Sequence, residues 1–250
     1  MNWIPFALAG AIAQLIDGSL GMGFGLTSST LLLTLGASAA GASAAVHIAE
    51  IGTTLSSGVS HWHRDNVDRR ILIYLAIPGG IGAALGATLL ASINLENGRV
   101  FISTILLLLG FVLLYRNIFQ SIQPNLVEIS NPRYLTFLGF TGGFVDASGG
   151  GGWGPVVTPT LMATTQTEPR KIIGTVSAAE FIVAVCASLA FLANLSRLDI
   201  NWTAVAGLAF GGMLLAPVAA KIVAWLPKRQ LGILVGIAII LINAIRLIGN

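Results

Sequence analysis

The sequence predicts an all-α integral membrane protein composed of two inverted repeats, each with one glycine-broken, re-entrant helical segment and three transmembrane helices. Three observations lead to this prediction. The 250 residues are 55% hydrophobic and only 9% charged, with a mean hydropathy of +0.85, whereas soluble domains contain about 25% charged residues. Apolar segments of about 20 residues, long enough to cross a bilayer, recur along the whole chain and leave no room for a soluble domain. The third observation is a motif that occurs twice.

The chain divides into a first membrane repeat at residues 1–119, a linker loop at 120–133 and a second membrane repeat at 134–250. Each repeat opens with a segment that glycines interrupt, at residues 3–37 and 134–165. Window hydropathy then predicts three long apolar helices per repeat, at residues 42–60, 71–92, 99–118, 172–195, 202–225 and 229–248. The linker contains prolines and asparagines, as expected of a loop.

The duplicated motif is an acid followed by a run of glycines. Its first copy extends from Asp17 to Gly25, and its second copy lies 129 positions later, from Asp146 to Gly154. Carboxylates and irregular backbone are costly in hydrocarbon and occur there only where protein or water surrounds them. The duplication therefore predicts a functional site. The first copy is less rich in glycine, so the two halves are not expected to contribute equally.

Two topologies fit the broken segments, because each segment either crosses the membrane or enters and returns as a hairpin. The apolar arms beside the glycines hold about a dozen residues, or about 20 Å, which is shorter than the roughly 30 Å hydrocarbon core. If the segments cross, the basic residues divide seven to six between the two sides; if they return, the division is ten to three. The second division matches the positive-inside rule. It favours re-entrant hairpins, both termini outside the cytoplasm, and two oppositely oriented halves.

The repeat continues past the motif with one inserted residue, at an offset of 130. Five residues of the first half then match five of the second, namely Val46, Ala49, Glu50, Arg99 and Arg116 with Val176, Ala179, Glu180, Arg229 and Arg246. A pair of glycines also recurs, at Gly79-Gly80 and Gly211-Gly212. Small residues let membrane helices approach closely, so these pairs are interpreted as packing surfaces.

The glycine motifs are suited to bind a small anion. A hairpin that stops inside the membrane starts its second arm with backbone N–H groups that lack helical partners, and glycines let a ligand reach them. Nearby hydroxyl groups add donors and two aromatic rings could wall the cavity. The predicted substrate-binding residues are Ser19, Gly21, Gly23, Phe24, Gly25, Thr27, Ser148, Gly150, Gly152, Trp153, Gly154 and Thr158. Because no lysine or arginine is near either motif in sequence, the cavity favours small oxyanions over polyphosphates. Tight packing of a broken helix is the alternative interpretation.

Five polar residues are candidates for coupling transport to a second ion: Asp17, Glu50, Asp146, Glu180 and His47. A medium of low dielectric constant favours the protonated form of a carboxyl group, which lets it exchange protons near neutral pH. The alternative for Asp17 and Asp146 is capping of the amides that follow them. Glu50 and Glu180 either couple transport or satisfy the broken backbone. His47 lies three residues before Glu50 on the same helix face and either shares its proton or bonds to a backbone carbonyl.

Several function classes are disfavoured. The single Cys186 excludes an internal disulfide and a metal site built on cysteine, and no metal or cofactor is expected. The 13 lysines and arginines lie mostly between apolar segments, so no nucleic-acid partner is expected. A phosphate-binding P-loop does not fit, since Pro155 follows the second motif. The expected partners are the lipid bilayer, a small anion and, where transport is coupled, protons.

Two halves that each open with an acid-led glycine motif and carry a glutamate in the next helix resemble the sulfite exporter TauE/SafE family of membrane permeases. The resemblance covers essentially the whole chain. It implies a multi-pass protein of the cytoplasmic membrane that transports small sulfur-containing anions such as sulfite, sulfoacetate or other organosulfonates. It does not fix the anion or the direction of transport.

The leading hypothesis is a secondary transporter that alternates access between inverted repeats, with or without proton coupling through Glu50 or Glu180. A passive anion channel would use the same donors. An intramembrane hydrolase with Asp17 and Asp146 as acid and base is disfavoured, because these acids precede the glycines rather than follow them. The protein is therefore not expected to be an enzyme.

Overall fold

The computed structural model describes residues 3–93, 95–119, 131–164, 167, 169–194, 196, 198–222 and 228–248. Within these residues the chain forms ten α-helices and no strand, so the expectation of an all-helical membrane protein is confirmed. Residues 120–130 of the expected linker lie outside the described part.

The five helices of the first half are α1 (Ile4–Leu20), α2 (Phe24–Thr34), α3 (Ala39–Trp62), α4 (Arg69–Ser92) and α5 (Leu95–Phe119). The five of the second half are α6 (Pro132–Gly149), α7 (Trp153–Thr164), α8 (Pro169–Ala193), α9 (Trp202–Ile222) and α10 (Lys228–Ile248). All six predicted long helices are present, as α3 to α5 and α8 to α10. The two broken segments are the pairs α1–α2 and α6–α7.

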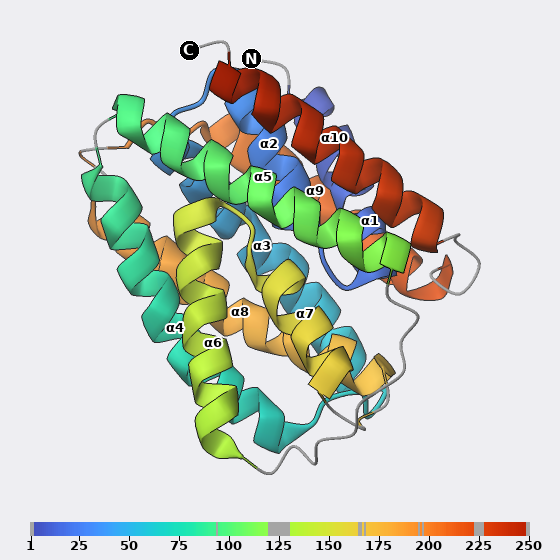
Figure 1. The fold of residues 1–250 in the computed structure, drawn as a ribbon. Helices are drawn as coiled ribbons and strands as arrows, with labels where there is room; N and C mark the ends of the chain where they lie inside the picture. The colour runs from blue at the N-terminus through green and yellow to red at the C-terminus, as the bar shows by residue number, and fades with distance from the viewer. Residues whose placement is uncertain are drawn as a thin grey trace.

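The arms of the broken segments differ in length, which sequence patterning did not anticipate. The helices after the glycines are short, with 11 residues in α2 and 12 in α7. The helices before them are longer than the expected dozen, with 17 residues in α1 and 18 in α6. Both helices include the aspartate of the motif in their last turn, because tertiary packing overrides the low helix propensity of the glycines that follow it. In Figure 1, α6 rises from the lower end of the molecule and α7 returns toward it.

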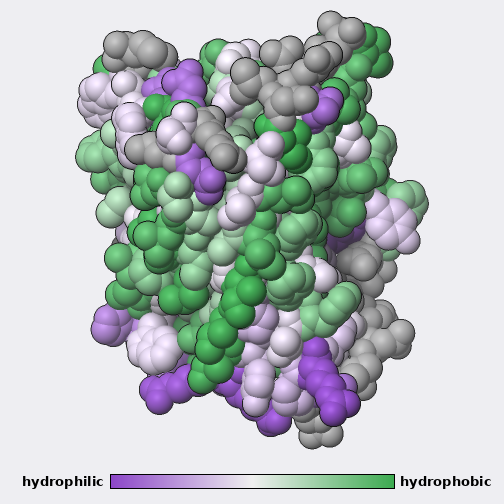
Figure 2. All heavy atoms as spheres, turned by 90° about the vertical axis from the view of Figure 1, so that its left-hand side faces the viewer, coloured by the Kyte–Doolittle hydropathy of each residue, from purple (hydrophilic) through white to green (hydrophobic). Residues whose placement is uncertain are grey.

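Four described helices are long and apolar enough to cross a membrane: residues 69–92 in α4, 100–119 in α5, 171–193 in α8 and 202–219 in α9. The helix α3 is also long, with 24 residues, but its small and polar side chains are mostly buried against protein. Outward-facing isoleucines follow α4 at every fourth position, at Ile73, Ile77 and Ile81. Figure 2, which views this side, shows hydrophobic residues across the middle of the molecule and hydrophilic ones toward its ends. Such a surface is expected of a protein solvated by lipid.

The two halves pack crosswise. The first helix of each half lies against the fourth helix of the other, so that α1 packs on α9 and α6 packs on α4 (Figure 1). Glycines make both contacts close, since a Cβ atom on Gly211 would lie 1.8 Å from the Ala7 carbonyl oxygen, and one on Gly143 would lie 2.0 Å from that of Gly79. The interpretation of the recurring glycine pairs as packing surfaces is confirmed.

Candidate functional site

The glycines of both motifs take backbone conformations that other residues rarely adopt. Gly21 ends α1 with φ of 68°, and Gly150 ends α6 with φ of 72°. One further glycine in each link, Gly23 at φ 134° and Gly151 at φ 147°, also lies in the positive region. These angles cost little only for glycine. The repeated glycines therefore build two sharp breaks between helices, as the sequence predicts.

The two breaks hold each other through exchanged hydrogen bonds. The Thr158 hydroxyl on α7 donates to the Gly21 carbonyl at 2.9 Å. The Ser29 hydroxyl on α2 donates to the Gly150 carbonyl. Both the donors and the acceptors are separated by 129 positions, the offset of the motif. The same contact is thus made twice, each time between the two halves.

The last glycine of each motif lets the two breaks touch. A Cβ atom on Gly25 would lie 2.5 Å from the Cα of Gly151, and one on Gly154 would lie 2.7 Å from the Cα of Met22. Real Cβ atoms do not approach carbon atoms this closely. In this conformation the backbones of the motifs are in contact, so an anion would bind beside these glycines and not between them.

The aspartates that lead the motifs lie over the helix N-termini that follow. The Asp146 Oδ1 atom accepts hydrogen bonds from the amides of Gly152 at 2.7 Å and Trp153 at 3.0 Å. The Asp17 Oδ1 atom accepts a longer bond of 3.5 Å from the Phe24 amide. This is the capping geometry, and the aspartates thereby occupy the amide N–H donors that the sequence analysis assigned to a bound anion. An anion would have to replace a carboxylate to use them.

The side chains expected to line the cavity mostly face protein. Thr27 donates to the carbonyl of Gly23, the N-cap of its own helix, at 2.7 Å, and Ser148 donates to that of Phe144 within α6 at 2.6 Å. The side chain of Ser19 lies outside the described part. Trp153 is fully buried, and its Nε1 donates to the Val176 carbonyl at 3.1 Å.

The two aromatic rings occupy matching places in the core. The Trp153 ring lies 2.8 Å from a Cβ position built on Gly79 of α4. The Phe24 ring lies 3.0 Å from one built on Gly212 of α9. Each ring therefore fills the space that a glycine of the other half leaves open. This is a packing role in the conformation described.

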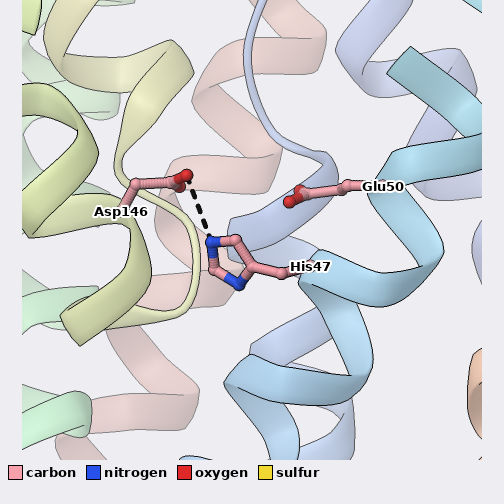
Figure 3. Close-up of side chains that lie close together, drawn as sticks. All are labelled: His47, Glu50 and Asp146. Carbon is pink, nitrogen blue, oxygen red and sulfur yellow. Dashed lines mark hydrogen bonds and ion pairs between the residues drawn. The ribbon is translucent and has the colours of Figure 1, made fainter. Parts of the chain in front are cut away.

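A cluster of three ionisable side chains lies beside the second break (Figure 3). The His47 Nε2 atom is 3.2 Å from Asp146 Oδ2, and both side chains are buried, with 0% and 2% exposed. Glu50 follows one turn later on α3, and the three groups offer atoms that all lie within 4.8 Å of one another. Figure 3 shows the two carboxylates pointing toward each other across the His47 ring. Sequence analysis singled out all three residues but could not bring Asp146, 99 positions away, to His47.

The hydrogen bonds of His47 determine where a proton must lie. Its Nδ1 atom is 2.8 Å from the Ser43 carbonyl oxygen, and a carbonyl only accepts, so Nδ1 carries a hydrogen. An ionised Asp146 also only accepts, so the contact with Nε2 needs a second proton between these two groups. The Ser43 hydroxyl ties the same turn of α3 to α6, donating to the Ala147 carbonyl at 2.8 Å.

Glu50 lies in an unusual environment for a carboxyl group. It is 2% exposed, and among the described residues its Oε2 atom has no hydrogen-bond partner. Its Oε1 atom lies 3.1 Å from a Cβ position built on Gly25, beside the contact of the two breaks. A buried carboxylate without partners is costly unless it binds a proton or another cation. Glu50 therefore stays a candidate for binding a proton or another cation.

The other two candidate acids, Asp17 and Glu180, lie in the same region. Glu180, on α8 and partly exposed, interacts electrostatically with Asp17, Glu50 and Asp146. The arrangement is not symmetric, because Ser177 stands at the position that matches His47 at the offset of 130. Within the described residues, the buried histidine–aspartate pair joins α3 of the first half to α6 of the second, and no equivalent pair joins α8 to the first motif.

Sequence reasoning missed an arginine at the site. Arg116 of α5 donates from Nη1 to the Met22 sulfur at 3.3 Å and from Nη2 to the Met162 sulfur at 3.2 Å. Met22 belongs to the first motif and Met162 to α7, so the expectation of a site without nearby lysine or arginine is wrong in three dimensions. The available signal was that an arginine recurs in the apolar helix at both Arg116 and Arg246.

His47, Glu50 and Asp146 also lie close enough to share a metal ion. Histidine nitrogen and carboxylate oxygen are ligands that zinc and related ions accept. The sequence, which lacks the cysteine and HExxH patterns of common sites, predicts that no metal binds. That prediction remains to be tested.

Comparisons with known proteins agree with the membrane architecture. A sequence model of the family described as sulfite exporter TauE/SafE matches residues 6–245. The Bacillus subtilis (strain 168) protein named "Probable membrane transporter protein YtnM" is 46% identical over 250 residues, which cover 99% of this chain and 83% of that protein. No solved structure matches the chain.

Proposed function

The chain belongs to the sulfite exporter TauE/SafE family of membrane transporters, and we propose from this that it is a secondary transporter of a small sulfur-containing anion, such as sulfite or an organosulfonate, in the cell membrane. The observation that carries the proposal is the pair of exchanged hydrogen bonds between the two breaks. They join two broken segments, one from each half, at a single place inside apolar sequence. Transporters bind substrates and coupling ions at such places.

We further propose that the halves are inverted repeats, each opening with a re-entrant hairpin, with the halves at 1–119 and 134–250. The crosswise packing of α1 on α9 and of α6 on α4 supports this. The helices α2 and α7 span about 17 to 18 Å, too short to cross the hydrocarbon core. Rocking of one half against the other would then break and remake the contacts between the breaks, which gives alternating access.

The coupling ion in this proposal is the proton. The pair of His47 and Asp146 requires one proton between its atoms, and Glu50 offers an unpartnered oxygen beside it. If the breaks separate, the amides of Gly152 and Trp153 and the carboxylate that caps them become accessible together. A proton bound here would offset the negative charge of the acids while an anion is carried.

Uptake of labelled sulfite, sulfoacetate and sulfate into proteoliposomes tests the function. A secondary transporter gives saturable uptake of at least one anion, and a proton-coupled one accumulates it when a pH gradient is imposed. Uptake in which the internal anion concentration never exceeds the external one, with or without the pH gradient, would favour the passive channel. Absence of anion flux would contradict the proposal.

Glu50→Gln and Glu180→Gln form a matched pair for the coupling step, because they occupy equivalent positions in the two halves. Glu50→Gln is expected to abolish accumulation driven by the pH gradient while uptake down the anion gradient continues. If Glu50→Gln leaves gradient-driven accumulation unchanged, the coupling group lies elsewhere. A loss with Glu180→Gln alone would move it to the second half.

A further inference from the structure

We propose that Arg116 is the residue that binds the transported anion, through a guanidinium group held ready between the two broken segments by two thioether sulfurs. This inference rests on the proposed function and names a binding residue that the glycine motifs by themselves do not supply.

The position of Arg116 brings it to both halves of the molecule at once. It lies near the end of α5, within the apolar stretch at residues 100–119. One nitrogen of its guanidinium group contacts Met22 in the link between α1 and α2, and the other contacts Met162 in α7. An anion held by this group would therefore sit where the two broken segments meet.

The chemistry of the contacts leaves the guanidinium group largely unsatisfied. An arginine inside a membrane protein normally pairs with an acid or with backbone carbonyls. Among the described residues no carboxylate lies within ion-pair distance of Arg116, and the acceptors at its two terminal nitrogens are sulfur atoms. A thioether is a weak acceptor, and the Arg116 side chain is only partly buried. The group thus has donors available to a stronger acceptor.

A sulfur oxyanion matches those donors. A guanidinium group presents parallel N–H bonds that bind two oxygens of a planar, pyramidal or tetrahedral oxyanion at once. Sulfite and sulfonates carry three such oxygens. The methionines can yield, because their side chains are flexible and uncharged. An acid in their place would compete with the anion and would hold the arginine in a salt bridge.

The contact has no counterpart at the matching positions of the repeat. At the offset of 129, the positions that match Met22 and Met162 are Gly151 and Leu33, neither of which carries sulfur. The matching positions therefore cannot form a second thioether cradle, in contrast to the hydrogen bonds between the breaks, which occur twice among the described residues. One anion per molecule is expected at this place.

Met22 also connects the arginine to the contact between the breaks. A Cβ atom on Gly154 would lie 2.7 Å from the Cα and Cβ atoms of Met22. An anion that draws the guanidinium group away from the Met22 sulfur would therefore act beside the point where the second motif rests on the first. Binding at Arg116 is thus placed to influence how the two halves separate.

Methyl-¹³C methionine NMR of the full-length protein in lipid nanodiscs tests the inference directly. The chain has four methionines, so the spectrum is simple. Titration with sulfite at constant ionic strength is expected to shift the methyl resonances of Met22 and Met162 saturably. Met213, which is 45% exposed on α9, serves as the internal reference and is expected to stay in place. Chloride at equal concentration is expected to leave all resonances unchanged.

Three variants complete the test. Arg116→Lys keeps the charge but loses the fork geometry, so its dissociation constant for sulfite is expected to rise about tenfold; Arg116→Gln, which loses both, is expected to raise it by up to about 100-fold. Arg133→Gln, an exposed arginine at the start of α6, is the matched control and is expected to bind within about twofold of wild type. The Met213 resonance reports on whether each variant is folded. If Arg116→Gln unfolds, Arg116→Lys and the wild-type titration still test whether Arg116 binds sulfite.

The possible failures are distinguishable. If wild-type proteoliposomes transport sulfite but the Met22 and Met162 resonances do not move, or if both Arg116 variants bind sulfite as wild type does, the inference is overturned and the proposed function stands. If wild-type protein neither binds nor transports any of the tested anions, the proposed function itself fails, and the role of Arg116 falls with it.

Discussion

Replacing Gly25 by alanine measures how much the contact between the two breaks stabilises the fold. Gly25 lies in the first turn of α2 and has an ordinary helical φ, so alanine is compatible with its backbone. The added Cβ atom would lie 2.5 Å from the Cα of Gly151 and 3.1 Å from Glu50 Oε1. Carbon atoms pack at about 3.5 to 4.0 Å, so one break must move away from the other by about 1 Å.

The control is Gly98→Ala in α5. A Cβ atom there would meet only Ala39 Cβ at 3.4 Å and Ile93 Cγ2 at 3.9 Å, which are ordinary contacts. In a helix alanine is favoured over glycine by up to about 1 kcal/mol, so Gly98→Ala is expected to be neutral or stabilising. Gly25→Ala gains the same propensity but incurs an overpacking cost of about 1 to 3 kcal/mol. That cost is the expected difference between the two variants.

Thermal unfolding of purified protein in one detergent, followed by tryptophan fluorescence, measures this difference. For a chain of this size about 1 kcal/mol corresponds to about 2 to 4 °C in Tm. Gly25→Ala is therefore expected to unfold about 2 to 12 °C below Gly98→Ala. Equal Tm values for the two variants, or a higher one for Gly25→Ala, would show that the breaks do not touch as described.

Three further predictions follow from the same contacts. Asp146→Asn keeps a capping side chain but removes one partner of the buried His47–Asp146 pair, so it is expected to lower stability by about 3 to 5 kcal/mol. A double variant with His47→Ser that is destabilised by the full sum of the two single effects would contradict the pairing. Thr158→Val removes the hydrogen bond to the Gly21 carbonyl and is expected to lower the free energy of unfolding by about 1 kcal/mol. Thr141→Val is the control, because the Thr141 hydroxyl bonds only within its own helix, and it is expected to cost less. Equal effects of the two variants would argue against the exchanged bonds. In a Cys186→Ser background, single cysteines at residues 64 and 171 are expected to react with a membrane-impermeant reagent from the same, cytoplasmic side. Labelling of the two cysteines from opposite sides would favour the crossing topology.

The sequence predicted the helices well because their signals are local. Window hydropathy alone located all six long helices, and the positive φ angles at Gly21 and Gly150 explain why glycines recur in the motifs. Hydropathy is less informative for α3, because most of its side chains face other helices and are not exposed to lipid. The lengths of α1 and α6 were underestimated because the low helix propensity of glycine and aspartate is a small effect that tertiary packing overcomes.

The contacts at the site could not be predicted in the same way, since they depend on how distant segments meet. His47 and Asp146 were each singled out, but no local pattern pairs residues 99 positions apart. The sequence analysis gave Arg116 no role at the site, because basic residues near helix ends are expected to face the membrane surface. Its long side chain instead reaches Met22, 94 positions away. Long flexible side chains separate the place of a charge from the place of its Cα atom.

Counterflow in proteoliposomes tests the central claim, that the two halves give a sulfur anion alternating access to the two sides of the membrane. Vesicles loaded with unlabelled sulfite are diluted into medium with a trace of labelled sulfite and no pH gradient. A carrier is expected to accumulate label transiently above its equilibrium level, because each outward-facing site returns with a labelled anion. Label that rises only to equilibrium, at the same rate in loaded and empty vesicles, would contradict the account.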